Sequence, residues 1–255
     1  MKQKTKAKAK AKTIAIVVFV VVVCGVGSAL LFSWMFKALQ GNEAPASAAA
    51  PGGAAVTVGG AAIGAPEWAF YFFNAYVQEV QTAQQLAAYG MTGWDSTKSP
   101  FGQSRKNADG TTQPMEEYLR GETNKYALQV LALCDEAEKT GVQIQASKRQ
   151  EIEQNMQQLQ AAARSSGISL EESLRKQYAE GVTEAVMRTV LERSYLSEAL
   201  RLQKAAELGE EGYAAYVAAA AQARKLQEND AQINAAMALA NEMCGKYLDY
   251  INAQK

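Results

Sequence analysis

An uncharged, apolar run of 24 residues, 13–36, constrains this chain more than any other feature. At about 1.5 Å of helical rise per residue it would reach about 36 Å, more than the roughly 30 Å hydrocarbon core of a bilayer. Six alternating lysines, from Lys2 to Lys12, precede the run, and the next charged residue is Lys37. Because clustered lysines stay in the cytoplasm, we predict a single-pass membrane anchor from Thr13 to Phe36, with residues 1–12 inside and the rest outside.

Two other interpretations of this run stay open. A cleaved signal peptide has an apolar stretch of about 7–15 residues followed closely by a small-residue cleavage site. Here the only such site, Ala46-Ser47-Ala48, lies ten residues beyond Phe36. Lipidation would use Cys24, but valines stand before it where small residues are expected. The length of the run favours the uncleaved anchor. Its Gly25-x-x-x-Ala29 spacing is of the small-residue type through which membrane helices can associate, but such a spacing often arises by chance.

The chain beyond the anchor is acidic. The whole chain has 26 basic and 26 acidic residues, and the six tail lysines leave 20 basic residues against 26 acidic ones, a net charge of −6. This charge gives no reason to expect nucleic acid as a partner. Ala, Pro and Gly dominate residues 37–55 and predict a linker. Residues 56–255 are then long enough to form one exported domain with a sizeable core.

The chain contains no histidine. This excludes Ser-His-Asp and Cys-His catalysis, histidine zinc sites and Glu-x-x-His di-iron sites. There is also no phosphate loop of the G-x-x-x-x-G-K type and no C-x-x-C pair. We therefore predict no catalytic residue, no metal ion and no cofactor.

Two cysteines lie in the exported part. Cys134 and Cys244 each sit in the apolar stripe of a predicted helix. A disulfide between them is chemically allowed outside the cytoplasm. Because the sequence does not bring the two residues together, we favour buried free thiols.

Helical patterns cover most of residues 56–255 and predict an all-α fold. The predicted helices span residues 66–89, 114–140, 146–165, a short stretch between Ser169 and Gly181, 184–208, and an Ala-rich stretch from about 212 to 252. Ser169-Leu170-Glu171-Glu172 is a capping box at the start of the short helix. Val56-Thr57-Val58, turned by Gly59-Gly60, predicts an extended piece that is too short to found a sheet.

Residues 90–113 lack periodicity and predict a long loop. A connection of this length is either a functional flap or a disordered insertion. Trp94 and Phe101 are placed to tuck it against the domain. The helix before it begins with a crowd of aromatic residues that cover more than one face: Trp68, Phe70, Tyr71, Phe72, Phe73 and Tyr76. At least one of these rings is expected to meet something other than the local core.

Three motifs follow one another in a distinctive order. Val56-Thr57-Val58-Gly59-Gly60 precedes the aromatic helix, and residues 137–144, Ala-Glu-Lys-Thr-Gly-Val-Gln-Ile, precede a charged amphipathic helix. The third motif is Ser-Leu-Glu-Glu-Ser-Leu at 169–174, with Tyr178, Gly-Val-Thr-Glu at 181–184 and Tyr-Leu at 195–196. In this order, behind an export anchor, residues 56–200 resemble the N-terminal chaperone region of exported SurA/PrsA-type foldases, a peptidyl-prolyl isomerase family.

The resemblance implies an extracytoplasmic helical domain that holds unfolded or partly folded exported proteins. In many relatives a parvulin-type isomerase domain follows. Here only about 55 residues follow Leu200, they have a helical pattern, and the histidines typical of a parvulin site are missing. The resemblance therefore implies a chaperone domain without the isomerase domain, completed by its C-terminal helix as in the family.

The leading hypothesis is a membrane-tethered holdase for unfolded or nascent exported polypeptides, because apolar contacts are non-directional and accept many sequences. The candidate client-binding residues are Trp68, Phe70, Phe72, Phe73, Tyr76, Trp94 and Phe101. A place in the core is the competing explanation for each ring. One alternative function is a scaffold protein that binds one envelope partner through the C-terminal helix. Another is a residual prolyl isomerase, which no residue constellation supports. The sequence specifies neither the clients nor the oligomeric state.

Overall fold

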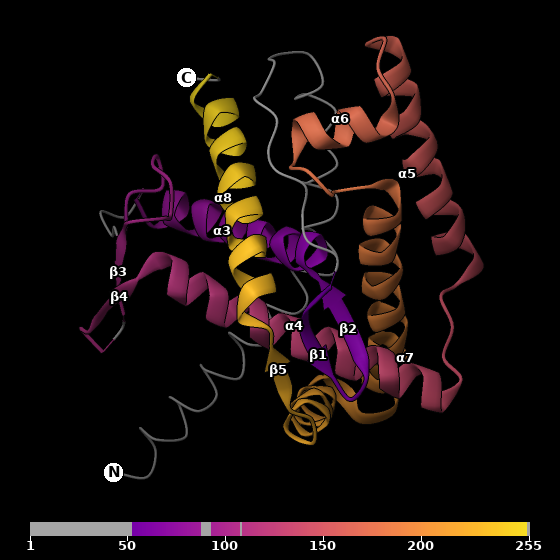
Figure 1. Cartoon of the computed structure of the whole chain (residues 1–255). Helices are drawn as coiled ribbons and strands as arrows, with labels where there is room; N and C mark the ends of the chain where they lie inside the picture. The colour runs from indigo at the N-terminus through magenta and orange to yellow at the C-terminus, as the bar shows by residue number, and fades with distance from the viewer. Residues whose placement is uncertain (1–52, 88–92, 108, 254–255) are drawn as a thin grey trace.

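Helices dominate the computed structural model, which describes residues 53–87, 93–107 and 109–253 (Figure 1). The predicted cytoplasmic tail, the anchor and most of the linker lie outside these residues. Within the described ranges, no helix combines the length and the apolar character needed to cross a bilayer.

The described elements follow one another as β1 (Ala54–Val58), β2 (Ala61–Gly64), α3 (Ala65–Ala87), β3 (Ser104–Lys106), β4 (Thr112–Pro114), α4 (Met115–Thr140), α5 (Ala146–Ser165), α6 (Leu170–Gln177), α7 (Glu184–Gln222), β5 (Leu226–Glu228) and α8 (Asp230–Asn252). The predicted dominance of helices is confirmed. The all-α class is corrected by two small sheets.

The larger sheet has the order β2-β1-β5, and both pairings are antiparallel. Gly59 and Gly60 turn β1 into β2 with φ of 58° and 93°, a region that side chains with a Cβ rarely occupy. On the other side of β1, Val58 pairs with Leu226. The expectation that the first strand is too short to found a sheet was therefore wrong, because the partner strand comes from the far end of the chain. This partner strand also interrupts the Ala-rich helix that was predicted from about 212 to 252.

The aromatic half of α3 forms the centre of the core. Phe70 lies 5.4 Å from Tyr178, which follows α6, and Phe73 lies 5.8 Å from Tyr247 of α8, measured between ring centroids. On a third side, Tyr71 meets Tyr126 of α4 edge-on at 5.0 Å. The rings cover several faces of α3 because α3 is enclosed on several sides.

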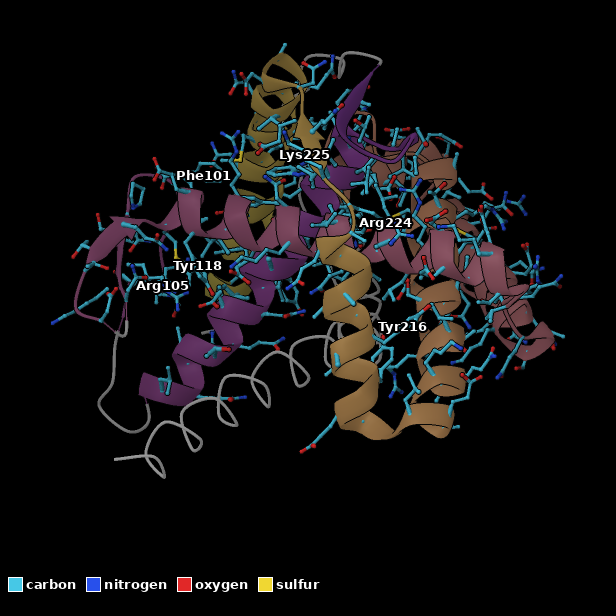
Figure 2. All side chains as sticks on the ribbon, turned by 90° about the horizontal axis from the view of Figure 1, so that it is seen from below. Phe101, Arg105, Tyr118, Tyr216, Arg224 and Lys225 are labelled. Carbon is cyan, nitrogen blue, oxygen red and sulfur yellow. The ribbon has the colours of Figure 1, made fainter. Side chains whose placement is uncertain are left out.

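Residues 93–107 and 109–113 are tied to α3 and α4. Phe101 stacks on Phe72 with ring centroids 5.6 Å apart, so the predicted tucking of this segment is confirmed. The Arg105 guanidinium lies 3.6 Å from the centre of the Tyr118 ring and forms an ion pair with Glu79 at 3.1 Å. Figure 2 shows Arg105 and Tyr118 together at one end of the molecule. The short strands β3 and β4, which the sequence did not predict, pair within this segment.

Several helix ends lie at the residues predicted from the sequence. The Ser169 hydroxyl accepts a hydrogen bond from the Glu172 backbone amide at 3.0 Å, and Thr183 caps α7 in the same way through Val186 at 3.3 Å. Gly141, with φ of 70°, ends α4. α5 has the predicted bounds, and Figure 1 shows it on the outer side of α7 with α6 at one end.

The predicted break between residues 208 and 212 is confirmed, because the backbone is non-helical at Gly209. Gly209 has φ of 73° and ψ of 168°, and the helix resumes after it as far as Gln222. We call residues 184–222 the α7 hairpin, because its halves lie side by side (Figure 2) and Leu200 of the first packs with Tyr213 and Val217 of the second. A second interruption, which the sequence did not predict, comes later, where Asn229 caps α8 by accepting a hydrogen bond from the Gln232 amide at 3.3 Å.

Candidate functional site

The candidate aromatic residues of α3 lie inside the molecule. Trp68, Phe72, Phe73 and Tyr76 are 0% exposed and Phe70 is 3% exposed. Helices α4 and α8 pack against α3, and the Trp68 indole N–H donates to the Asn124 side chain at 2.9 Å. These five side chains are core residues, so they do not form the exposed client surface that their pattern suggested.

Trp94 and Phe101 are half-buried and pack against the same core. Phe101 is stacked on Phe72, and the Trp94 ring lies 6.0 Å from the Tyr76 ring. Both rings hold their segment down on α3. The structure therefore gathers all seven predicted residues in one place, but as packing partners.

The stripe of α8 that the scaffold alternative would use is also buried. Ile233, Ala236, Met243 and Cys244 are inaccessible to solvent. This helix packs on α3 and β1, so its apolar face completes the domain. No observation on the described residues favours the scaffold alternative.

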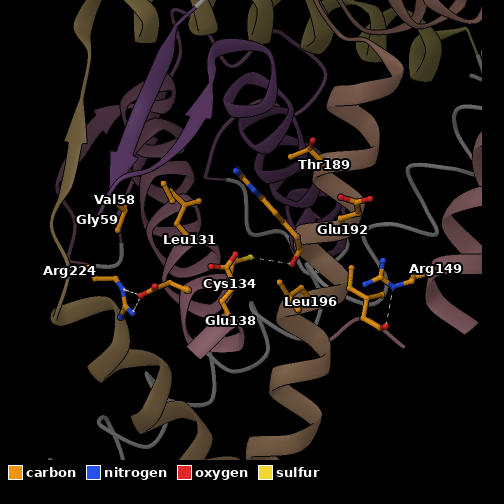
Figure 3. Close-up of a pocket in the computed structure, with 14 residues that line it drawn as sticks. Val58, Gly59, Leu131, Cys134, Glu138, Arg149, Thr189, Glu192, Leu196 and Arg224 are labelled. Atoms are coloured by element: carbon orange, nitrogen blue, oxygen red, sulfur yellow. Dashed lines mark hydrogen bonds and ion pairs between the residues drawn. The ribbon is translucent and has the colours of Figure 1, made fainter. Parts of the chain in front are cut away.

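An open groove lies elsewhere, between the β1–β2 turn, α4 and α7 (Figure 3). It consists of a cavity of about 450 Å³ and an adjoining one of about 250 Å³ that extends toward α5. The two cavities share Ile144, Arg149 and Glu192. We call them together the α4–α7 groove.

Apolar side chains from four parts of the chain line this groove: Val58, Leu131, Ile144 and Leu196. Leu131 and Val58 are buried at its floor, whereas Ile144 and Leu196 are half-buried. On α4, Leu131, Cys134 and Glu138 follow one another at three- and four-residue spacing, which places them on one helix face. The groove thus combines an apolar floor with charged edges.

Two arginines at the groove are fixed by carboxylates. Arg224 donates to Glu136 at 2.6 Å and to the adjacent Asp135 at 3.1 Å. The Tyr216 hydroxyl also donates to Glu136, at 3.1 Å. Figure 2 shows Arg224 and Tyr216 on the same side of the molecule. Hydrogen bonds from Arg224 hold the pKa values of Asp135 and Glu136 below their usual range. These contacts join the second half of the α7 hairpin to α4.

The other arginine, Arg193, is half-buried and forms an ion pair with a buried carboxylate behind the groove. Its guanidinium donates to Glu67 of α3 at 2.7 Å and to the Ala62 carbonyl of β2 at 3.0 Å. The Tyr71 hydroxyl also donates to Glu67 at 2.7 Å. Burial raises the pKa of Glu67, and the opposing effects of Arg193 and Tyr71 are smaller. This network connects α7, α3 and the edge strand β2.

The cysteine at the groove is a weak nucleophile. Burial raises the pKa of the Cys134 thiol to about 11, so the thiol is protonated at neutral pH. Cys134 and Cys244 are both free, as expected, but only Cys244 is buried, whereas Cys134 is half-buried. In the part of the chain that the structure describes, no group of three or more Cys, Asp or Glu residues is arranged to hold a metal ion.

Sequence reasoning missed the groove because its walls come from segments far apart in the chain. Only local face patterns hinted at it: Thr189, Glu192, Arg193 and Leu196 share one face of α7. The arrangement is suited to holding a short extended polypeptide by apolar contact and charge. In comparisons with family models, curated proteins and solved structures, no match to this chain was found.

Proposed function

We propose that this protein is a membrane-tethered, extracytoplasmic holdase that binds unfolded or partly folded exported polypeptides in the α4–α7 groove. The apolar run of residues 13–36 and the lysines before it support the tether and its orientation. The resemblance to SurA/PrsA-type chaperone regions supports the class of client. The groove replaces the α3 aromatics as the binding surface.

The open groove is the observation that carries this proposal. An unfolded chain exposes apolar side chains, and burying one Leu or Phe is worth about 1.5–3 kcal/mol before ordering costs. The apolar part of the groove rests on Val58, Leu131, Ile144 and Leu196, so it can accept such a side chain. Contacts of this strength give weak and reversible binding, which suits a protein that must release its clients.

The groove is also held in shape before a client arrives. The Arg224 contacts fix the second half of the α7 hairpin to α4, and the Arg193–Glu67 pair fixes its first half to α3. Binding therefore requires little reordering of the walls, which lowers its entropic cost. The apolar side chains of the client are then buried against the floor of a preformed site.

The test uses the full chain in phosphatidylcholine vesicles and a protein that aggregates on heating, followed by light scattering. We expect the wild type to suppress aggregation and Ile144→Ser to lose most of this effect. The control is Leu202→Ser, which removes a comparable apolar side chain at a site that is 47% exposed and outside the groove. Thr189→Trp provides a second variant that fills the groove from a half-exposed position.

Two results of these assays would contradict parts of the proposal. A wild-type chain that fails to suppress aggregation at several-fold excess would overturn the proposal. If Ile144→Ser and Leu202→Ser lost the suppression of aggregation equally, with unchanged melting temperatures, the client site would lie outside the groove. The isomerase alternative stays a prediction, and an isomerisation assay on a proline peptide with the full chain tests it.

A further inference from the structure

The charges around the α4–α7 groove indicate which client segments it prefers. We infer that the groove selects extended segments in which an apolar residue stands next to a lysine or arginine. This inference rests on the proposed function, because it assumes that the groove is the client site. It concerns the class of segment that the site recognises.

Two carboxylates lie at the edges of the groove. Glu138 belongs to α4 and Glu192 to α7, and Figure 3 shows them on the two different helices. Both side chains are exposed, and within the described ranges neither makes an ion pair or a hydrogen bond. Their negative charge is therefore available to a ligand.

Most other charges of the groove are already neutralised. Arg224 is paired with Asp135 and Glu136, and Arg193 with Glu67. In the smaller cavity, Glu153 is paired with Arg188. These pairs contribute little net field to a bound segment, which leaves Glu138 and Glu192 as the dominant anionic groups.

Arg149 is the one groove cation without an ion pair among the described residues, and it opposes this effect. Its Nε donates a long hydrogen bond of 3.5 Å to the Ile144 carbonyl at the junction of the two cavities. Two available carboxylates against one guanidinium still leave the groove negative. The excess of six acidic residues beyond the predicted anchor acts in the same direction at longer range.

A cationic side chain next to an apolar one fits this arrangement. The apolar side chain would lie on the floor, and the ammonium or guanidinium group would reach the edge carboxylates. At an exposed edge such a contact is worth up to about fivefold in affinity and weakens as salt screens it. Two such contacts would therefore favour a basic segment by about two- to twenty-five-fold over a neutral one.

The experiment measures the anisotropy of three labelled peptides with the full chain in phosphatidylcholine vesicles, which carry no net charge. The peptides share one Leu-Phe centre flanked by Lys, Gln or Glu. We expect the Lys peptide to bind most tightly and the Glu peptide least tightly, with the difference shrinking as salt rises. The double variant Glu138→Gln/Glu192→Gln should remove most of the preference, and Arg149→Gln should strengthen binding of the Lys peptide.

The control variant is Glu211→Gln/Asp249→Asn, which removes the same charge from two exposed positions outside the groove. An unchanged Lys preference in this control supports the inference. Equal effects of the two double variants would overturn it in favour of general attraction to an acidic domain. Equal binding of all three peptides, lost in Ile144→Ser, would overturn it while the holdase proposal stands. If no peptide binds and aggregation is not suppressed, both fail.

Discussion

At the scale of single residues, the Arg224 contacts show how charge holds the groove together. Asp135 and Glu136 have pKa values lowered by hydrogen bonds from Arg224, so these carboxyl groups bind protons less readily in the folded state. Their contribution to stability is present above the unfolded pKa of about 4 and is lost as pH falls through the lower folded values. The contact is partly exposed, so solvent and salt reduce its strength.

We predict that Arg224→Gln lowers the melting temperature at pH 6 and has a smaller effect at pH 3, because pH 3 lies below the unfolded pKa of about 4, where the contribution of the two carboxylates is already declining. Circular dichroism of the full chain in vesicles at the two pH values measures this. Lys225→Gln is the matched control, because Lys225 is the exposed neighbour and makes no ion pair within the described ranges (Figure 2). An equal loss at both pH values would show that Arg224 acts through packing instead.

The pair of Glu67 and Arg193 allows a second residue-scale prediction. Removing one partner leaves the other charge buried, which costs about 3–5 kcal/mol. We expect Arg193→Met to destabilise strongly, and Glu67→Gln/Arg193→Met to destabilise less than Arg193→Met alone. Chemical denaturation of the three proteins tests this coupling. A double variant at least as unstable as Arg193→Met alone would show that the pair is not coupled.

At the scale of elements, the α7 hairpin depends on two glycines. Gly209 has φ of 73°, and a Cβ at Gly212 would lie 2.7 Å from the Leu208 Cβ. We predict that Gly209→Ala destabilises the chain by about 1–2 kcal/mol, because an L-residue is strained at this φ. Gly245 of α8 has open space around its Cβ position, so Gly245→Ala should stabilise by about 0.5–1 kcal/mol. Thermal unfolding measures the change in stability of both variants. A change in the same direction in both would contradict the assignment of the kink.

The elements also show what the sequence could and could not predict. The caps at Ser169 and Thr183 and the apolar spacing of α5 are local signals, so the boundaries they predict are confirmed. β5 has only three residues and is a strand because β1 lies beside it, a pairing that no local pattern reveals. The Asn229 cap was the available signal for the start of α8, and it was missed.

At the scale of the whole molecule, the position of the candidate site depends on which apolar residues are buried in the core. Aromatic density in α3 suggested a surface, but α4, α6, α8 and the segment containing Phe101 cover it together. The groove received no strong sequence signal, because its walls are assembled from distant segments. A dense aromatic cluster in such a chain therefore predicts the centre of the core better than it predicts a binding site.

The described residues contain two apolar clusters, which leads to a last prediction. The larger surrounds α3, and a smaller one joins the end of α4 to the α7 hairpin through Leu133, Leu200 and Tyr213. Because the smaller cluster buries less apolar surface, we expect hydrogen exchange to be faster in residues 200–220 than in α3 and α8. Leu200→Ala should accelerate exchange mainly there, whereas Met243→Ala should accelerate it throughout the domain.

Leu196 borders both the groove and the smaller cluster, so a bound client peptide should slow exchange in α7 before it affects α8. Exchange slowed equally in both helices would mean that the two clusters unfold as one unit.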